Sequence, residues 1–207
     1  MIVEDRAHKS LDLNPRRHPR GASYPDKSQK HVAKYMWDVA LLSNSEMHFI
    51  QDVPRLLGGG DYANLGHAKG GSAILLADGF RENNLTGKIY SVDLFPRNKL
   101  LRIATQELAR FKVTQWIELC SGNTDEWAFK LQDKQFTFLF IDADHTYQAV
   151  KRDFENWNSL VKPGGCVSFH DTNQEFSHRA IEETVALMWP ELKEYHIDRI
   201  RTFQKPL

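Results

Sequence analysis

Acidic and imidazole side chains follow two separate apolar segments of this sequence. Asp142, Asp144 and His145 come directly after the run FTFLFI. His170 and Asp171 come directly after the run CVSF. Carboxylate oxygens and imidazole nitrogens bind divalent cations, and an imidazole also exchanges protons near neutral pH. The two groups therefore predict metal binding, acid–base catalysis or both, provided that the fold brings them together.

The segment between the two groups predicts how they are positioned. Both runs are short and apolar, which is typical of strands covered on both faces of a parallel sheet. From Tyr147 to Val161, apolar residues recur at spacings of three and four, which predicts an amphipathic helix that ends before the following PGG. A right-handed crossover makes the two strands parallel, so both acidic groups should lie at the carboxyl edge of the sheet. Open α/β sheets bind ligands at that edge.

A glycine-rich turn precedes this region. Gly66, Gly70 and Gly71 lie between a predicted strand at 61–65 and an apolar-periodic helix that begins near Ser72. Glycine allows positive φ angles and close approach of a ligand, and the following helix offers free backbone N–H groups. The spacing G-x-x-x-G-G differs from the G-x-G-x-x-G of dinucleotide-binding turns. The turn therefore favours a ligand other than NAD, and a tight turn without a ligand is the alternative.

Two further strands should contribute to the same edge. The strand predicted at 88–92 ends in Asp93, about 20 residues beyond the glycine turn, where an acidic residue can bind ribose hydroxyls. A helix N-cap is the alternative role for Asp93. The strand predicted at 116–120 is followed by the polar loop 121–124, which could contact an adenine ring.

Composition indicates one domain that acts on a small molecule. The chain has 207 residues and is 41% hydrophobic, enough for one sizeable core. Lys+Arg and Asp+Glu are 27 each, so no overall charge attracts nucleic acid or an anionic membrane. We find no apolar run long enough to cross a membrane and no signal-peptide pattern, and therefore expect a cytoplasmic protein. Cys120 and Cys166 lie in predicted strands and should be buried thiols.

The two ends of the chain are less regular. Residues 1–30 mix proline, glycine and arginine and predict an N-terminal arm, with the domain at 31–207. The arm could be a flexible terminus, a contact in a homo-oligomer or a basic lid over an anionic substrate. Ser45 should cap a helix that ends before Pro54.

Near the C-terminus, residues 179–189 predict a helix, and 194–197 and 200–203 predict two short strands. A helix is also expected near 32–39, and another after Pro96.

The segments NLGHAKGGS, IYSVD, FIDADHTYQAVKRDFENW, VKPGG and FHDT resemble class I S-adenosylmethionine-dependent methyltransferases. The group concerned contains macrolide-sugar O-methyltransferases and cephalosporin-hydroxylase-like proteins, and the resemblance covers about residues 61–172. It implies an α/β fold with a doubly wound, mostly parallel, seven-stranded sheet. It also implies a set of residues that bind S-adenosylmethionine: Asn64, Gly66, Gly70, Gly71, Ser72, Asp93, Gly122, Asn123, Thr124 and Asp142.

Two positions differ from what the resemblance implies. Asn64 stands where relatives often have an acidic residue, and it offers a hydrogen bond but no charge to the ammonium group of the cofactor. His170 and Asp171 stand where metal-binding relatives usually have an acid or an Asp-Asn pair. An imidazole suits transition metals better than Mg²⁺, so His170 could be a third metal ligand, a structural residue or a base.

The preferred mechanism is metal-assisted O-methylation of a small-molecule hydroxyl. A divalent ion, Mg²⁺ or a transition metal, would bind to Asp142 and Asp171. His145, expected on the first turn of the following helix, would be the general base, and Asp144 would cap that helix. Two other classes remain open. They are a nicotinamide-dependent oxidoreductase and a non-catalytic cofactor-binding protein.

Overall fold

The computed structural model describes residue Met36 and residues 39–95 and 98–207. The predicted arm at 1–30 and the domain boundary after it lie outside these residues, as does most of the helix predicted near 32–39. The role of the arm in a homo-oligomer or as a lid therefore stays a prediction.

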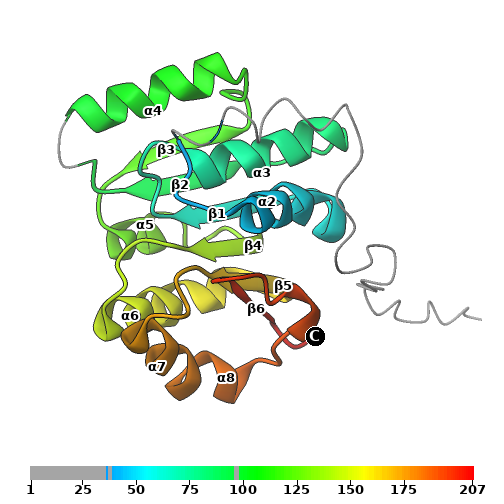
Figure 1. Ribbon diagram of the computed structural model, residues 1–207, viewed down its shortest axis with the longest axis vertical. Coiled ribbons are helices and arrows are strands. Elements are labelled where there is room, and N and C mark those ends of the chain that lie inside the picture. Colours follow the sequence, from blue (N-terminus) through cyan, green and yellow to red (C-terminus); the bar gives the residue numbers. More distant parts are fainter. Residues whose placement is uncertain (1–35, 37–38, 96–97) are drawn as a thin grey trace, which may run out of the picture.

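A six-stranded sheet runs through the molecule in the order β3-β2-β1-β4-β5-β6 (Figure 1). Strands β1 to β5 pair in parallel, and β6 is antiparallel to β5. The strands are β1 Asp61–Leu65, β2 Ile89–Asp93, β3 Ile117–Ser121, β4 Phe136–Ile141, β5 Val161–Phe169 and β6 Arg201–Gln204. The mostly parallel, doubly wound order confirms the predicted fold class.

The sheet has one strand fewer than expected within the described residues. A strand was predicted at 194–197, but Lys193–Tyr195 forms a short 3₁₀ helix, η3. Ile197 pairs with Ile200 alone, in an isolated antiparallel bridge. This segment folds back on itself and so has no ladder to extend, and the final strand begins at Arg201.

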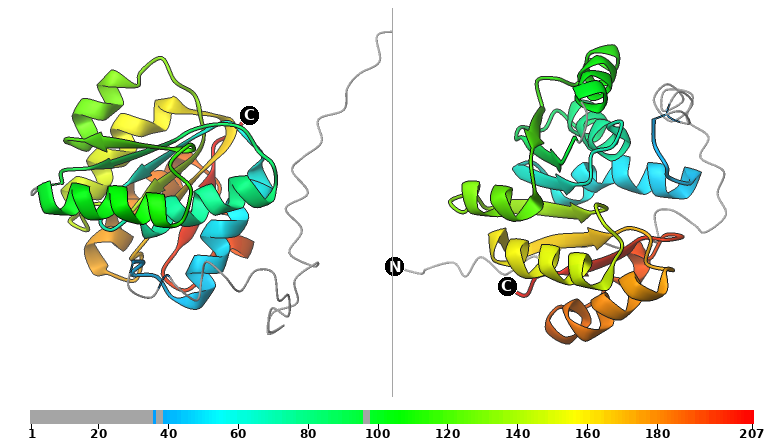
Figure 2. Two further views of the ribbon diagram at one scale, coloured as in Figure 1. Left: turned by 90° about the horizontal axis from the view of Figure 1, so that it is seen from above. Right: turned by 90° about the vertical axis from the view of Figure 1, so that its left-hand side faces the viewer.

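Helices cover both faces of the sheet, as Figure 2 shows from two sides. One core cluster joins the sheet to α2, α3 and α4, and a second joins it to α5, α6, α7 and α8. The helices are α2 Asn44–Leu57, α3 Gly71–Glu82, α4 Asn98–Arg110, α5 Thr124–Lys130, α6 Tyr147–Trp157, α7 Glu175–Glu183 and α8 Val185–Met188. Among the described residues, none of these helices could cross a membrane.

Alternation along the strands explains why both faces are buried. Phe138 and Phe140 of β4 belong to the first cluster, whereas Leu139 and Ile141 belong to the second. Successive side chains of a strand point to opposite faces, so a continuous apolar run fits a strand between two helical layers. The two cysteines, in β3 and β5, are buried and free, as expected.

The start and end of α2 differ from the prediction. Ser43, and not Ser45, is the N-cap, because its side chain accepts a hydrogen bond from the Glu46 N–H while the Glu46 side chain accepts one from the Ser43 N–H. Ser45 lies inside the first turn. The helix also continues past Pro54 to Leu57, where the Gly58 N–H donates to the Pro54 carbonyl.

Two other boundaries also differ. Helix α6 ends at Trp157, a 3₁₀ turn (η2, Asn158–Leu160) follows, and β5 already begins at Val161. Phe136 pairs with Val161 and Phe138 with Cys166, so residues 162–165 form an irregularity within the strand. The single helix predicted at 179–189 is two helices, separated at Thr184 by a non-helical backbone (φ −128°, ψ −77°).

Candidate functional site

A cavity of about 500 Å³ lies at the carboxyl ends of the parallel strands. All of the predicted cofactor-binding residues line it except Asn64 and Gly70. His145, His170 and Asp171 line the same cavity. Cavities of this size bind small molecules and cofactors. The structure therefore brings together the glycine turn and the acidic groups, which are far apart in the sequence.

The glycines allow close packing at the cavity wall. Gly66 has φ +90°, and a Cβ atom there would lie 2.1 Å from the carbonyl oxygen of Asp142. A Cβ at Gly71 would lie 2.6 Å from the Cα of Ala40, in the segment before α2. Gly70 has φ +104° and is the N-cap of α3. The turn therefore needs glycine for backbone packing, and it directs the N-terminus of α3 towards the cavity through Gly71 and Ser72.

Asn64 lies behind the turn. Its Nδ2 donates to the Ser91 hydroxyl at 2.8 Å and to the Gly66 carbonyl at 3.1 Å. His67, which the sequence reading missed, places Nδ1 2.6 Å from the same hydroxyl. Asn64 Oδ1 and His67 Nε2 have no hydrogen-bond partner among the described residues. Burial lowers the pKa of His67 to about 4, so its ring is neutral at neutral pH.

Asp93 ties the turn to the end of β2. Its Oδ2 accepts hydrogen bonds from the backbone N–H groups of His67 (2.9 Å) and Ala68 (2.8 Å), and its Oδ1 accepts one from Phe95 (3.2 Å). Asp93 also lines the cavity. A carboxylate has about four acceptor positions and these bonds use three, so Asp93 can still accept one hydrogen bond from a ligand.

The loop after β3 is held by a residue that the sequence reading missed. Gly122, Asn123 and Thr124 line the cavity, and the Thr124 hydroxyl donates to Asp153 Oδ1 at 2.6 Å. Asp153 is buried on α6, and this burial raises its pKa to about 6. The loop is therefore fixed against α6 at one end of the cavity.

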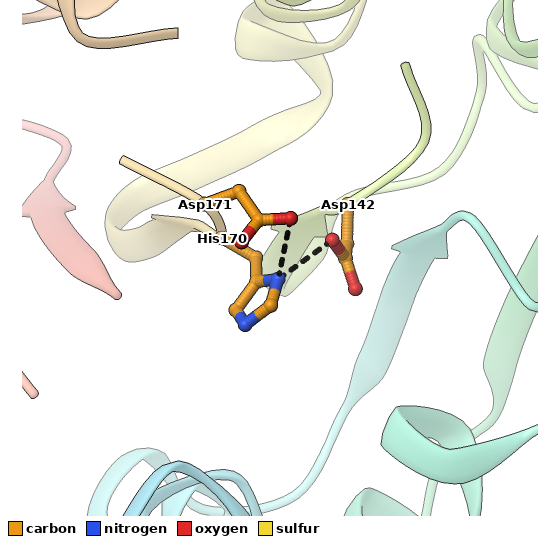
Figure 3. Close-up of side chains that lie close together, drawn as sticks. All are labelled: Asp142, His170 and Asp171. Atoms are coloured by element: carbon orange, nitrogen blue, oxygen red, sulfur yellow. Dashed lines mark hydrogen bonds and ion pairs between the residues drawn. The ribbon is translucent and has the colours of Figure 1, made fainter. Parts of the chain in front are cut away.

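Asp142, His170 and Asp171 form a compact cluster at the other end. Figure 3 shows both carboxylates directed towards Nδ1 of His170, at 2.9 Å from Asp142 Oδ1 and 3.5 Å from Asp171 Oδ2. One ligand atom from each residue lies within 4.8 Å of the other two. Asp171 has φ +51°, a left-handed conformation that is uncommon outside glycine and costs energy. Such strain is common at functional sites.

Glu46 lies behind this cluster and is fully buried. Its Oε2 is 3.3 Å from His170 Nε2 and accepts hydrogen bonds from the Ser43 N–H (2.7 Å) and Arg199 Nη2 (2.8 Å). Burial alone would raise the pKa of Glu46, but His170, Arg199 and Ser43 lower it to about 2. Glu46 is therefore ionised in the folded protein.

Arg199 joins Glu46 to the cluster. Its Nε donates to Glu46 Oε1 at 3.1 Å, and its Nη1 donates to Asp171 Oδ1 at 2.8 Å. Its Nη2 also donates to the Leu41 carbonyl at 3.1 Å. Burial would favour a neutral His170, but the carboxylates of Asp142 and Glu46 raise its pKa to about 9. In the absence of a metal ion, His170 is therefore protonated at neutral pH.

His145 lies beside Asp171 but not where we expected within its segment. Its Nε2 is 3.3 Å from Asp171 Oδ2. His145 was expected on the first turn of α6, whereas it precedes Thr146, the N-cap, whose hydroxyl accepts from the Ala149 N–H. The prediction that Asp144 caps this helix was also wrong, because Asp144 instead accepts from the Thr146 N–H.

Glu46 and Arg199 were missed for different reasons. Ser43 and Glu46 form the pattern S-x-x-E, a capping signature that was available in the sequence. Arg199 lies just before the last strand, and its contact with Glu46 spans 153 positions of the chain. We find no local sequence signal for that contact.

Comparisons with known proteins agree with the observed fold. Residues 63–172 match the family model described as a methyltransferase domain. A curated protein of Sinorhizobium fredii (strain NBRC 101917 / NGR234), "Uncharacterized protein y4gI", is 43% identical over 42 residues, which are 20% of this chain and 5% of that protein. The chain therefore spans only a small part of the length of this relative.

Solved structures resemble most of the fold. The O-methyltransferase of Bacillus cereus, in complex with SAH, has a TM-score of 0.64 and 19% identity, and the match covers 81% of this chain and 85% of that one. The O-methyltransferase TomG of Streptomyces achromogenes, involved in tomaymycin synthesis and in complex with SAM, has a TM-score of 0.66 and 15% identity, with 88% and 91% covered. At these identities the similarity shows a shared fold.

Proposed function

Because the chain belongs to the methyltransferase-domain family, we propose that it transfers the methyl group of S-adenosylmethionine to a hydroxyl group of a small molecule. This proposal rests on one observation. A single cavity contains the glycine turn, Asp93 and the loop after β3 together with the Asp142–His170–Asp171 cluster. Binding of the methyl donor and activation of the acceptor can therefore occur side by side.

The cofactor would lie along the first part of this cavity. The methionine end would contact Gly66, Gly71 and Ser72, where the N-terminus of α3 favours the carboxylate. Asp93 would accept a hydrogen bond from a ribose hydroxyl, and the loop after β3 would contact the adenine. Asn64 would support the turn from behind, in agreement with its bonds to Ser91 and Gly66.

A divalent cation fits the chemistry of the cluster. Around His170 lie three carboxylates, from Glu46, Asp142 and Asp171, and Arg199 pairs with two of them, Glu46 and Asp171. One guanidinium against three carboxylates leaves two negative charges to balance when His170 is neutral. Nδ1 of His170 faces both aspartates, and its Nε2 faces Glu46. A histidine that binds a metal usually has a carboxylate or carbonyl at its other ring nitrogen.

We propose that Asp142, Asp171 and His170 hold this cation. When bound, it would lower the pKa of the acceptor hydroxyl and stabilise the alkoxide that develops. The remaining tasks belong to the protein, which must hold the hydroxyl in line with the donor methyl group and remove one proton.

We assign the proton transfer to His145. Its Nε2 faces Asp171 Oδ2, so Nδ1 remains to accept the hydroxyl proton, and Asp171 would stabilise the charged ring. His170 suits this role less, because both of its ring nitrogens face carboxylates and it is buried. The acceptor would also have an apolar part, since the exposed side chains of Leu41 and Leu94 line the cavity.

Replacement of the base tests this assignment. We expect His145→Ala to lower kcat by roughly 10²–10⁴-fold while the affinity for S-adenosylmethionine stays unchanged. Steady-state kinetics with saturating cofactor would measure the first effect and calorimetry the second. If His145→Ala kept the wild-type kcat, His145 would not be the base.

Calorimetry with purified protein tests the proposed cofactor. We expect S-adenosylhomocysteine to bind to one site per chain and NAD to show no binding. Asp93→Ala should weaken S-adenosylhomocysteine, because a ribose hydroxyl loses a charged acceptor worth about 1.5–3 kcal/mol. Binding of NAD instead would support an oxidoreductase. Binding of S-adenosylhomocysteine without methyl transfer to any hydroxyl compound would support a binding protein.

A further inference from the structure

Glu46 connects the start of α2 with the Asp142–His170–Asp171 cluster. It has no exposed surface, yet it is not a residue of the cavity wall. One of its oxygens, Oε2, lies within 3.3 Å of His170 Nε2 and also accepts from Arg199. Burial of a charged carboxylate is costly unless it is compensated, so these contacts fix the position of Glu46.

Arg199 extends this connection to Asp171. Its guanidinium donates to both oxygens of Glu46 and, through Nη1, to Asp171 Oδ1. With Oδ1 occupied, Asp171 directs Oδ2 towards His170 and His145. The planar guanidinium makes this geometry specific, because its donors have fixed directions.

We infer that Glu46 and Arg199 are positioning residues for the cation-binding groups of this site. Glu46 holds His170 so that its Nδ1 faces the two aspartates. Arg199 holds Asp171 so that its Oδ2 faces this Nδ1. Glu46 lies outside the cavity wall and Arg199 lines the cavity, but both act on the cation through His170 and Asp171. The inference rests on the proposed function, since it concerns the cation proposed there.

A second pair provides a matched control. Arg201 donates through Nε and Nη2 to Glu191, at 2.8 Å and 2.9 Å, and both side chains are nearly buried, with 7% and 9% of their surface exposed. Among the described residues that line the cavity, neither member of this pair occurs. Glu191→Gln therefore makes the same chemical change as Glu46→Gln, in a similar arginine pair away from the site.

The experiment measures binding of Mn²⁺ alone, by electron paramagnetic resonance, to the full chain and to its Glu46→Gln and Glu191→Gln variants. Thermal unfolding and calorimetry with S-adenosylhomocysteine accompany it. We expect Glu46→Gln to weaken Mn²⁺ by about 10-fold or more and to leave S-adenosylhomocysteine unchanged. Glu191→Gln should lower the Tm without changing either affinity.

Arg199→Lys provides a second, milder variant in case Glu46→Gln fails to fold. Arg199 is 34% exposed, and a lysine keeps the charge but loses the fork of donors. We expect Mn²⁺ affinity between those of the wild type and Glu46→Gln.

Three results would overturn the inference. The first is wild-type Mn²⁺ affinity in both Arg199→Lys and folded Glu46→Gln. The second is a loss of Mn²⁺ affinity in Glu191→Gln equal to that in Glu46→Gln. The third is no Mn²⁺ binding by the wild type. If the wild type failed to bind S-adenosylhomocysteine, the proposed function itself would fail.

Discussion

Arg199 and Arg201 are two residues apart, and each binds a buried or nearly buried glutamate through two nitrogens. Each also contacts a second carboxylate, Asp171 for Arg199 and Glu182 for Arg201. The elements that they join differ. Arg199 joins α2 to the cavity edge after β5, whereas Arg201 joins β6 to α7 and to the segment before η3. A buried ion pair is therefore not by itself a sign of a functional site, and the further contacts of its members decide its role.

The largest expected effect is on kcat, and it compares Asp171, which contacts Arg199, with Glu182, which contacts Arg201. Asp171→Asn removes a proposed cation ligand and the partner of His145, so kcat should fall by roughly 10²–10⁴-fold. Glu182→Gln should leave kcat unchanged, because Glu182 is about half exposed, with 47% of its side chain accessible, and lies away from the cavity. Methyl transfer at saturating cofactor measures both variants. Equal losses in the two variants would contradict the distinction between the pairs.

The next largest effect is on the free energy of unfolding, and it compares Glu46 with Glu191. Glu46→Gln removes a charge that two cations share, Arg199 and the protonated His170, and should lower the free energy of unfolding by about 3–5 kcal/mol. Glu191→Gln should cost about 1–3 kcal/mol, because Glu191 is less buried, with 9% of its side chain exposed against 0% for Glu46. Urea unfolding of the metal-free proteins measures both. A larger loss in Glu191→Gln would reverse our ranking of the pairs.

The smallest effect concerns acid stability. Hydrogen bonds from Arg201 lower the pKa of Glu191 from the ordinary value of 4.5 to about 2. Because the folded pKa lies below the unfolded one, the stabilisation is complete above about pH 4.5 and is lost as the pH falls towards 2. It amounts to roughly 3 kcal/mol as an upper value. Glu191→Gln should therefore unfold with a weaker dependence on pH in this range, and parallel curves for the two proteins would exclude the linkage.

Much of the sheet and of the cavity wall could be predicted from the sequence. Strands β1 and β4 have the predicted bounds, because their apolar runs end abruptly in turn or polar residues. The clustering of Asp142 with Asp171 followed from the parallel crossover, a rule of chain topology that does not depend on side-chain detail.

The rest of the site depends on contacts between distant segments. The contacts of Arg199 with Glu46 and Asp171 form only after α2, β5 and the C-terminal segment have packed together. The burial of Asp153 and its bond with Thr124 likewise require α5 and α6 to meet. The strand predicted at 194–197 is replaced by a 3₁₀ helix at Lys193–Tyr195. The local sequence pattern does not distinguish a short strand from such a turn.

Glu46 serves two systems at once, and this has a consequence for how the protein tolerates change. The same carboxylate closes the capping box of α2 and faces His170 and Arg199. A substitution that loosens the first turn of α2 therefore also disturbs the Asp142–His170–Asp171 end of the cavity, although it lies outside the cavity wall. In a library of variants selected for methyl transfer alone, Ser43 and Glu46 should accept as few replacements as the cavity residues do. Selection for activity would in this way also preserve the start of the helix.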